Sequence, residues 1–434
     1  MSTRETEGME LGTRMYSWAA DLFPVHRSIT GEGVRTTLAY LQKIVPELKV
    51  YAIPSGQKVF DWEIPLEWNV RDAYILDEQG RKIADFKKNN LHLVGYSVPV
   101  SKTIGLDELQ GHLYSLKDIP DAVPYVTSFY NANWGFCMSE NERRALKPGK
   151  YKVHIDSDLK KGNLNYGEII LKGKSKKEIL LSTYICHPSM ANNELSGPVV
   201  AIALAKWLKG LKNRRYTYRI VFLPETIGSI AYISKNRAKL KSNTAGGFVI
   251  TCVGDNKAWS MLESRDKNSI FDRVGKHVLK YHTGDNYKCF SFLHRGSDER
   301  QYSSVGVDLP MVSLMRSKYA EYREYHTSHD NMSFISPEGL LGGYSIHKRA
   351  IEVLENNLKY KVTTICEPRL GKRGLYPHES TADTLKKIML MSNIIGYADG
   401  KTDLLSLAEK IEADFFDCLP LVQKLSEKNV LRVV

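Results

Sequence analysis

Four short segments carry side chains that can bind a metal ion or move a proton, and each follows or borders a run of apolar residues. They contain His187, Glu225, Asp255 and His326. Imidazole nitrogens and carboxylate oxygens are the usual zinc ligands, and a carboxylate beside a reacting group can also act as a general base. If the apolar runs are neighbouring strands, these side chains meet at one edge of a sheet. The pattern therefore predicts a metal-assisted hydrolytic site.

Each of these residues also has a purely structural interpretation. Asn193 or Ser196 could cap the helix that follows His187, and Glu225 could favour the positive N-terminus of the next helix. Asp255 could be a turn residue, and His326 could belong to a satisfied histidine pair in a loop. The order of the four segments along the chain therefore carries more weight than any one residue.

The elements that would position these residues alternate between strand and helix. Predicted strands cover 168–171, 178–185, 218–223, 247–253 and 309–314, and predicted helices cover 197–211, 230–240, 268–281 and 337–357. This alternation indicates an α/β fold with a mostly parallel sheet flanked by helices. Sites in such sheets lie at the C-terminal ends of the strands, where the four segments fall.

The 434 residues are too many for one ordinary domain and suggest two or three. We predict an α/β domain from 1–47 and 121–365, with a small β-rich domain inserted at 48–120. Residues 366–434 show three helical segments, at 381–395, 403–411 and 415–428, followed by a short strand. That order is typical of a winged helix-turn-helix module.

The net charge of +12 raises the question of nucleic-acid binding. The predicted winged-helix module holds ten basic and ten acidic residues, so all of the excess positive charge lies before it. A helix that reads DNA needs a basic face to neutralise phosphates. We therefore expect no nucleic-acid partner. We expect this module to pack against protein, including a second copy of the chain in a homo-oligomer. The upstream charge would attract acidic substrates or simply solvate the surface.

Other classes are excluded by simple patterns. Residues 1–10 have no apolar run, so no secretory signal is expected, and the most apolar stretch, near 198–208, is too short to span a membrane. The six cysteines are scattered, without a CxxC pair, as in reduced cytoplasmic proteins. We expect a cytoplasmic protein that makes no membrane contact.

The chain resembles two related groups of proteins. The order His, Asn or Glu, Glu, Asp and His resembles the co-catalytic zinc exopeptidases, including leucyl aminopeptidases. Seven motifs are similar to one bacterial aminopeptidase-like family linked to polysaccharide biosynthesis, whose members have an inserted β domain and a C-terminal winged helix. The motifs are RSITGEGVRTTL from residue 27, DWEIPLEWN from 61, NLHLVGYSVP from 90, WGFC from 134, CHPSMAN from 186, PETIGS from 224 and GSDERQY from 296.

This resemblance implies a zinc site with one or two ions. His187 and His326 match the two end ligands, and Asn193 falls at the position of the carboxylate that bridges two zinc ions. Glu225 falls where the zinc enzymes have two consecutive Glu residues, but here there is only one. It could therefore be the general base or a metal ligand, and we take it as the catalytic residue. The Asp of the third strand has no clean match, and Asp255 is the nearest candidate ligand.

Asn193 is the main departure from the zinc enzymes. A neutral amide oxygen cannot bridge two Zn²⁺ ions as a carboxylate does. A natural one-metal site, a loss of activity, or an engineered change from Asp to Asn would each give this sequence. In the segment from residue 296, Arg300 could bind a substrate carboxylate, with Asp298 beside it, although a surface ion pair between the two is an alternative.

These observations predict a zinc-dependent, aminopeptidase-like hydrolase that cleaves a small peptide or amide with a metal-activated water. An amidase or deacylase acting on an acylated amino sugar, or on a peptide-like biosynthetic intermediate, is the first alternative. A catalytically impaired binding or assembly protein is the second, because of Asn193.

Overall fold

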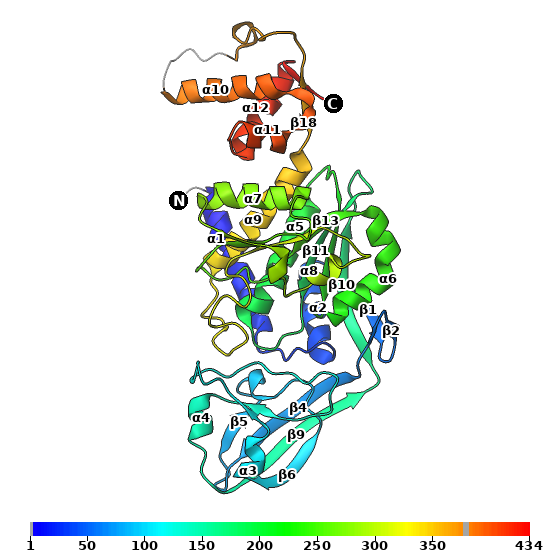
Figure 1. The fold of residues 1–434 in the computed structure, drawn as a ribbon, viewed down its shortest axis with the longest axis vertical. Coiled ribbons are helices and arrows are strands. Elements are labelled where there is room, and N and C mark those ends of the chain that lie inside the picture. Colours follow the sequence, from blue (N-terminus) through cyan, green and yellow to red (C-terminus); the bar gives the residue numbers. More distant parts are fainter. Residues whose placement is uncertain (1–2, 376–381) are drawn as a thin grey trace. The chain divides into compact units, whose positions relative to one another are not determined.

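The structure is a computed structural model that describes residues 3–375 and 382–434 (Figure 1). The chain divides into two compact units, Met1–Phe271 with Tyr287–Ser345 and Asp272–Asn286 with Ile346–Val434. Residue 381, the predicted start of the first C-terminal helix, lies outside the described residues. No helix within the described ranges combines the length and the apolar character needed to cross a membrane.

An eight-stranded mixed sheet forms the centre of the larger unit, in the order β1-β10-β12-β11-β13-β16-β14-β15. Its strands are β1 (Lys49–Pro54), β10 (Asn163–Leu171), β11 (Glu178–Tyr184), β12 (Thr217–Leu223), β13 (Thr244–Val249), β14 (Ser260–Leu262), β15 (Lys288–Phe290) and β16 (Met311–Met315). The four central strands are parallel, and β1 and β10 pair antiparallel with their neighbours. β14 pairs antiparallel with β16 and parallel with β15. β11 and β12 are buried at every position, as strands covered on both faces are. The predicted α/β class is confirmed.

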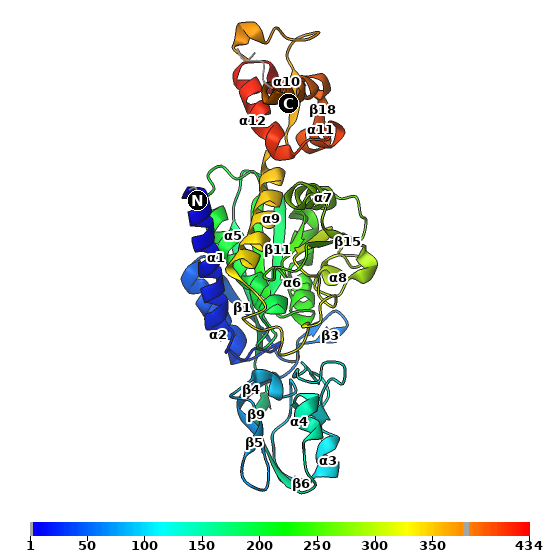
Figure 2. The same ribbon diagram turned by 90° about the vertical axis from the view of Figure 1, so that its left-hand side faces the viewer.

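Helices cover both faces of this sheet (Figure 2). The helices α1 (Thr3–Leu22), α2 (Glu32–Ile44) and α5 (Ser196–Gly210) pack together on one side, and α6 (Ile227–Asn243) and α8 (Glu299–Tyr302) lie on the other. Gly197 lets the start of α5 approach the sheet, because a Cβ atom there would lie 2.4 Å from the carbonyl oxygen of Ile250. This close approach places the turn before α5 directly at the strand ends.

A long excursion leaves the edge of the large sheet between β1 and β10. These two strands pair with each other, so the excursion runs from residue 55 to residue 162. It holds a four-stranded antiparallel sheet, β5-β4-β9-β6, made of β4 (Glu67–Leu76), β5 (Lys82–Asp85), β6 (Val100–Gly105) and β9 (Lys150–Lys160). The predicted insertion at 48–120 thus includes β1, which belongs to the large sheet, and omits β9, which the small sheet requires.

Short elements complete the excursion. They are the strands β2 (Lys58–Val59), β3 (Trp62–Glu63), β7 (Leu113–Tyr114) and β8 (Phe136–Cys137) and the helices α3 (Leu106–Gln110) and α4 (Glu140–Arg144). β2 and β3 form a small hairpin. This hairpin supplies Trp62 to the pocket described below.

The second unit contains three helices and a three-stranded antiparallel sheet in the order β18-β17-β19. The elements are α10 (Ala382–Tyr397), α11 (Leu404–Lys410), α12 (Phe415–Glu427), β17 (Lys359–Val362), β18 (Asp399–Asp403) and β19 (Leu431–Val433). β17 precedes residue 366, the predicted start of this module, and it is the central strand of the sheet. Two further helices, α7 (Ile270–Thr283) and α9 (Pro337–Asn356), contribute residues to both units.

Candidate active site

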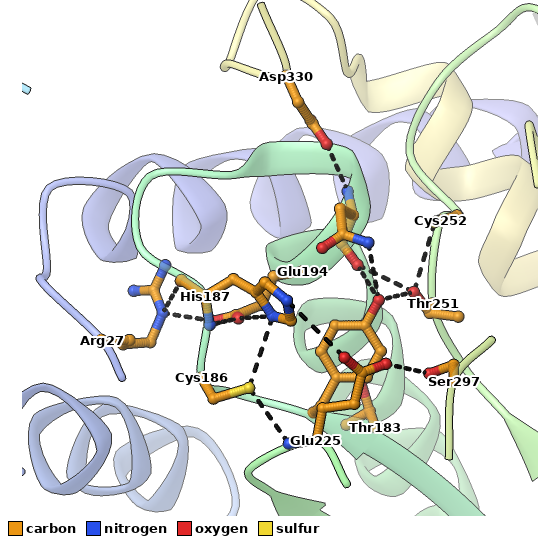
Figure 3. A network of polar contacts seen from close by, with 12 residues as sticks. Arg27, Thr183, Cys186, His187, Glu194, Glu225, Thr251, Cys252, Ser297 and Asp330 are labelled. Atoms are coloured by element: carbon orange, nitrogen blue, oxygen red, sulfur yellow. Dashed lines mark hydrogen bonds and ion pairs between the residues drawn. The ribbon is translucent and has the colours of Figure 1, made fainter. Parts of the chain in front are cut away.

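His187 follows the buried strand β11, and a carboxylate fixes the orientation of its ring. Its Nδ1 lies 3.1 Å from Oε2 of Glu194, which also accepts the backbone N–H of His187 (Figure 3). With Nδ1 held on this side, Nε2 faces a pocket, where Oε2 of Glu225 is 3.8 Å away. Burial disfavours the charged imidazole, but Cys186 and Glu194 outweigh it and raise the pKa of His187. A carboxylate that fixes the tautomer of a histidine is the usual support of a metal-binding ring.

Glu194 is itself paired with a buried arginine. Arg27 Nε donates to Glu194 Oε1 at 2.5 Å and to the His187 carbonyl oxygen at 3.1 Å, and both charged side chains are 0% exposed. A charge buried this deeply costs several kcal/mol unless it is paired and hydrogen-bonded. The Arg27–Glu194 pair therefore ties the loop after α1 to the strand-end histidine.

Glu225 follows β12 and faces the same pocket. The Ser297 hydroxyl donates to its Oε1 at 2.6 Å, which leaves Oε2 directed toward His187 (Figure 3). Its backbone N–H donates to the sulfur of Cys186 at 3.2 Å. Burial raises the pKa of Glu225 above its usual range, although the nearby His187 opposes the shift. A carboxylate with a raised pKa is suited to accept and return a proton.

His326 lies in the loop before α9 and completes the pocket. Its ring centroid is 5.3 Å from that of His187, and its carbonyl oxygen accepts the Tyr125 N–H at 2.9 Å. Within the described residues, its Nε2 is buried and has no hydrogen-bond partner. Burial, helped by His187, lowers the pKa of His326 to about 3, so the ring is neutral at pH 7. A neutral imidazole with a free nitrogen is the form that binds a metal.

Asn193 lies in a π-helical turn, Ala191–Leu195, that precedes α5. Its backbone N–H donates to Asp330 Oδ2 at 2.9 Å, and its Nδ2 donates to the Tyr184 hydroxyl at 2.9 Å. Among the described residues, its Oδ1 is buried without a partner. Tyr184 in turn contacts His187, with ring centroids 5.3 Å apart. The amide oxygen thus remains available one layer behind the pocket wall.

Asp255 does not reach the pocket. Its Oδ1 accepts Ser317 Oγ at 2.8 Å and Lys257 N–H at 2.8 Å, while Oδ2 accepts Asn192 Nδ2 at 2.9 Å and Ser317 N–H at 3.0 Å. Both oxygens are therefore occupied by neighbouring loops. The structure gives Asp255 the turn-stabilising role that was its structural alternative, and we do not retain it as a metal ligand.

The two predicted substrate-binding residues, Arg300 and Asp298, lie in different surroundings. Arg300 lines the pocket and donates from Nη2 to Thr226 Oγ1 at 2.7 Å. Asp298 is fully buried behind Glu225, where its Oδ1 accepts the Thr226 N–H at 2.8 Å and the Ser229 hydroxyl at 2.7 Å. Burial raises the pKa of Asp298 to about 7, with Glu225 adding to the shift. Arg300 can contact a substrate, whereas Asp298 supports the Glu225 loop.

The pocket has a volume of about 350 Å³, within the range of small-molecule sites. It is lined by Ile29, Trp62, Tyr125, Thr127, Phe129, Tyr130, Cys186, His187, Glu225, Thr226, Ile227, Arg300 and His326. Three of these residues, Phe129 (φ 33°), Thr226 (φ 64°) and His326 (φ 54°), hold left-handed backbone conformations. Such strain persists where surrounding structure fixes it, and it clusters at functional sites.

Two sets of side chains compete as a metal site. Ligand atoms of Cys186, His187 and Glu194 lie within 4.8 Å of one another. In that set, however, Glu194 is already paired with Arg27, and the sulfur of Cys186 already accepts the Glu225 N–H at 3.2 Å. The pocket offers His187 and His326 instead, and the unpartnered Oδ1 of Asn193 lies behind its wall. At position 193 this set has a neutral amide in place of the carboxylate that would bridge two zinc ions.

Four supporting residues were missed by sequence reasoning: Arg27, Glu194, Ser297 and Tyr125. Each acts through a hydrogen-bond partner from another segment of the chain. Glu194 and Ser297 stood beside the predicted residues Asn193 and Asp298. The one available signal was a charged residue, Glu194, inside an otherwise polar turn that opens an apolar helix. Cys252 packs in an apolar cluster with Leu262 and Met315.

The fold and this strand-end pocket define an aminopeptidase-like α/β protein. A zinc aminopeptidase from Bacillus subtilis shares the fold, with a TM-score of 0.56 and 14% identity over 79% of this chain and 94% of that one. At this identity the likeness concerns the fold alone.

A family model and a relative in Clostridium acetobutylicum establish the family of the chain. Residues 16–357 match the family described as a domain of unknown function, DUF4910, to which the chain belongs, and residues 358–433 match a winged helix-turn-helix family. A Clostridium acetobutylicum protein is 44% identical over 408 residues, which cover 94% of this chain and 93% of that protein. Its name assigns it provisionally to polysaccharide biosynthesis and gives it an aminopeptidase-like domain.

A crystal structure from the same organism, provisionally named a peptidase, has a TM-score of 0.93 and 41% identity over 99% of this chain and 98% of that one. Together these findings confirm the resemblance on which the expected fold and winged helix rested.

Proposed function

We propose that the protein is a zinc-dependent amide hydrolase that uses one metal ion. The observation that carries this proposal is the convergence of His187 Nε2, Glu225 and His326 on one pocket, where a buried imidazole nitrogen has no partner among the described residues. An apolar pocket with a few convergent polar groups of shifted pKa is the expected form of a catalytic site.

His187 and His326 would hold the zinc ion, with Asn193 Oδ1 as a neutral third donor. When bound, zinc supplies a Lewis acid that polarises the substrate carbonyl and lowers the pKa of a bound water. Glu225 accepts a proton from the attacking water and returns it to the nitrogen of the cleaved C–N bond. Ser297 holds Oε1 of Glu225 so that Oε2 stays directed into the pocket. Arg300 binds an anionic group of the substrate.

Metal content tests the proposal. Protein purified without chelators should contain about one zinc ion per chain, as a site with one ligand set does. We expect His187→Ala and His326→Ala each to lower zinc below roughly one tenth of that value, measured by mass spectrometry of the metal, because each removes one of the few strong donors. His329→Ala is the matched control, because its ring pairs with Asp121 at 3.2 Å and does not line the pocket. A wild-type protein without metal would sink the zinc assignment.

A second candidate function is favoured by Asn193 itself. Its amide is neutral, and its Nδ2 is already engaged by Tyr184. If the chain is an impaired binding or assembly protein, wild type should be inactive and Asn193→Asp should gain both hydrolysis and a second zinc ion, because a carboxylate can bridge two ions. For the one-metal hydrolase we expect wild type to be active already, measured with aminoacyl anilides.

The relative's link to polysaccharide biosynthesis supports an acylated amino sugar as an alternative substrate. N-acyl sugars therefore belong in the same assay. If the protein cleaves N-acyl sugars but not anilides, its substrate is a sugar amide and not a peptide-like amide. The proposed roles of Glu225 and zinc would stay the same.

A further inference from the structure

A larger cavity of about 680 Å³ lies beside the candidate active site. It is lined by Ser55, Gly56, Glu63, Ile64, Pro65, Leu66, Tyr96, Val98, Phe129, Tyr130, Asn131, Ala132, Leu159 and Lys161. The two cavities share Phe129 and Tyr130 and are therefore adjacent. The proposed hydrolytic roles make no use of this second cavity.

Most of the cavity wall is apolar, and the hydroxyls of Tyr96 and Tyr130 on it already donate to backbone carbonyl oxygens. Leu66, Val98 and Leu159 supply aliphatic surface, and Leu66 is 43% exposed. The two charged lining residues, Glu63 and Lys161, are both exposed. A sugar ring needs several hydrogen-bond partners along the wall, whereas an alkyl chain needs only apolar contact. The cavity therefore suits an apolar group better than a carbohydrate.

The shared wall between the two cavities is fixed in shape. Phe129 (φ 33°) and Tyr96 (φ 65°) both hold left-handed backbone conformations, which are rare for bulky residues, and their rings meet edge to face at 5.6 Å. The Tyr130 hydroxyl donates to the Glu63 carbonyl oxygen at 2.9 Å, which ties this wall to the β2–β3 hairpin. Strained aromatic residues held by outside contacts indicate a built binding surface.

We propose that this cavity is a subsite for the apolar acyl or alkyl part of the substrate, whose amide lies at His187 and Glu225. The substrate would be amphiphilic, with an amide at the metal site and an aliphatic chain extending past Phe129. The proposal rests on the proposed function only for the position of the amide. Burial of the chain follows from the cavity wall alone.

Binding of alkylureas tests the subsite without requiring catalysis. N-octylurea and N-ethylurea present the same planar, amide-like group, and they differ by six methylenes. Each buried methylene strengthens binding by roughly fourfold, so we expect octylurea to bind the full chain at least about thirtyfold more tightly by calorimetry. Val98→Trp narrows the cavity and should reduce this ratio by at least about threefold.

Val50→Trp is the matched control, because Val50 is 43% exposed on β1 and does not line the cavity. Thermal unfolding checks both variants, and Leu159→Phe replaces Val98→Trp if that chain does not fold. An equal affinity for the two ureas in wild type, or a ratio that survives the narrowed cavity, would overturn the proposal. Displacement of octylurea by a short oligosaccharide, but not by octanoate, would assign the subsite to a glycan instead. Loss of hydrolysis alone would leave these ratios unchanged and would affect only the proposed function.

Discussion

Glu225→Gln is expected to lower kcat/KM for amide hydrolysis by roughly 10²–10⁴-fold while leaving the zinc content unchanged. Glutamine keeps the size of the side chain and can still accept the hydrogen bond from Ser297, but it cannot take a proton from water. The loss corresponds to about 3–5 kcal/mol of transition-state stabilisation. Steady-state kinetics on the best substrate from the screen, with metal analysis of the same sample, would measure it.

Two variants make this result specific. Glu324→Gln is the matched control, because Glu324 pairs with Lys257 at 2.5 Å and does not line the pocket, and its rate should stay within about twofold of wild type. Ser297→Ala should instead shift the acid limb of the pH–rate profile to higher pH. The Ser297 hydroxyl stabilises the ionised carboxylate and lowers the pKa of Glu225, so its removal raises that pKa further. A Glu225→Gln enzyme that keeps more than a tenth of wild-type activity would remove the base role.

Arg27→Met is expected to destabilise the larger unit by about 3–5 kcal/mol. The change leaves the Glu194 carboxylate buried and without its cation, which is the costly way to break a buried ion pair. Glu194→Gln should weaken zinc binding by roughly 10–100-fold, because it disturbs the partner that orients His187. The double variant, Arg27→Met with Glu194→Gln, should recover part of the lost stability, since no uncompensated charge then remains.

Tryptophan fluorescence during urea unfolding isolates this effect. All six tryptophans lie between residues 18 and 259, within the larger unit, so the signal does not follow the winged-helix unit. Arg35→Met, which removes a half-buried pair with Glu67, is the control and should cost about 1 kcal/mol. Equal losses for the Arg27 and Arg35 variants would mean that the Arg27–Glu194 pair has no special role.

These two predictions distinguish a residue that acts on the substrate from residues that stabilise the site. Glu225 would act on the substrate directly, so its loss affects the rate and spares the fold. Arg27 acts through Glu194 and His187, so its loss affects stability and metal affinity first. A variant pattern that mixed the two would contradict the division of roles drawn from the hydrogen bonds.

The sequence by itself determined the α/β class and the strand-end positions of His187 and Glu225. Uninterrupted apolar strands such as β11 can exist only when both faces are covered, and polar residues that follow them must lie at the sheet edge. The three C-terminal helices were equally readable from local periodicity. These features depend on neighbours along the chain, which the sequence shows.

Only the tertiary structure decided which polar residues share the pocket and which serve the framework. Asp255 follows the same sequence logic as Glu225, yet Ser317 and Asn192 from other segments occupy its oxygens. Asp298, predicted beside Arg300, instead accepts the Ser229 hydroxyl behind Glu225. Arg27 meets Glu194 across 167 positions of sequence, and β1 leaves the predicted insertion because it pairs with β10. The physical reason is common to all these cases: a buried polar group is assigned its role by the partner that satisfies it, and the fold chooses that partner.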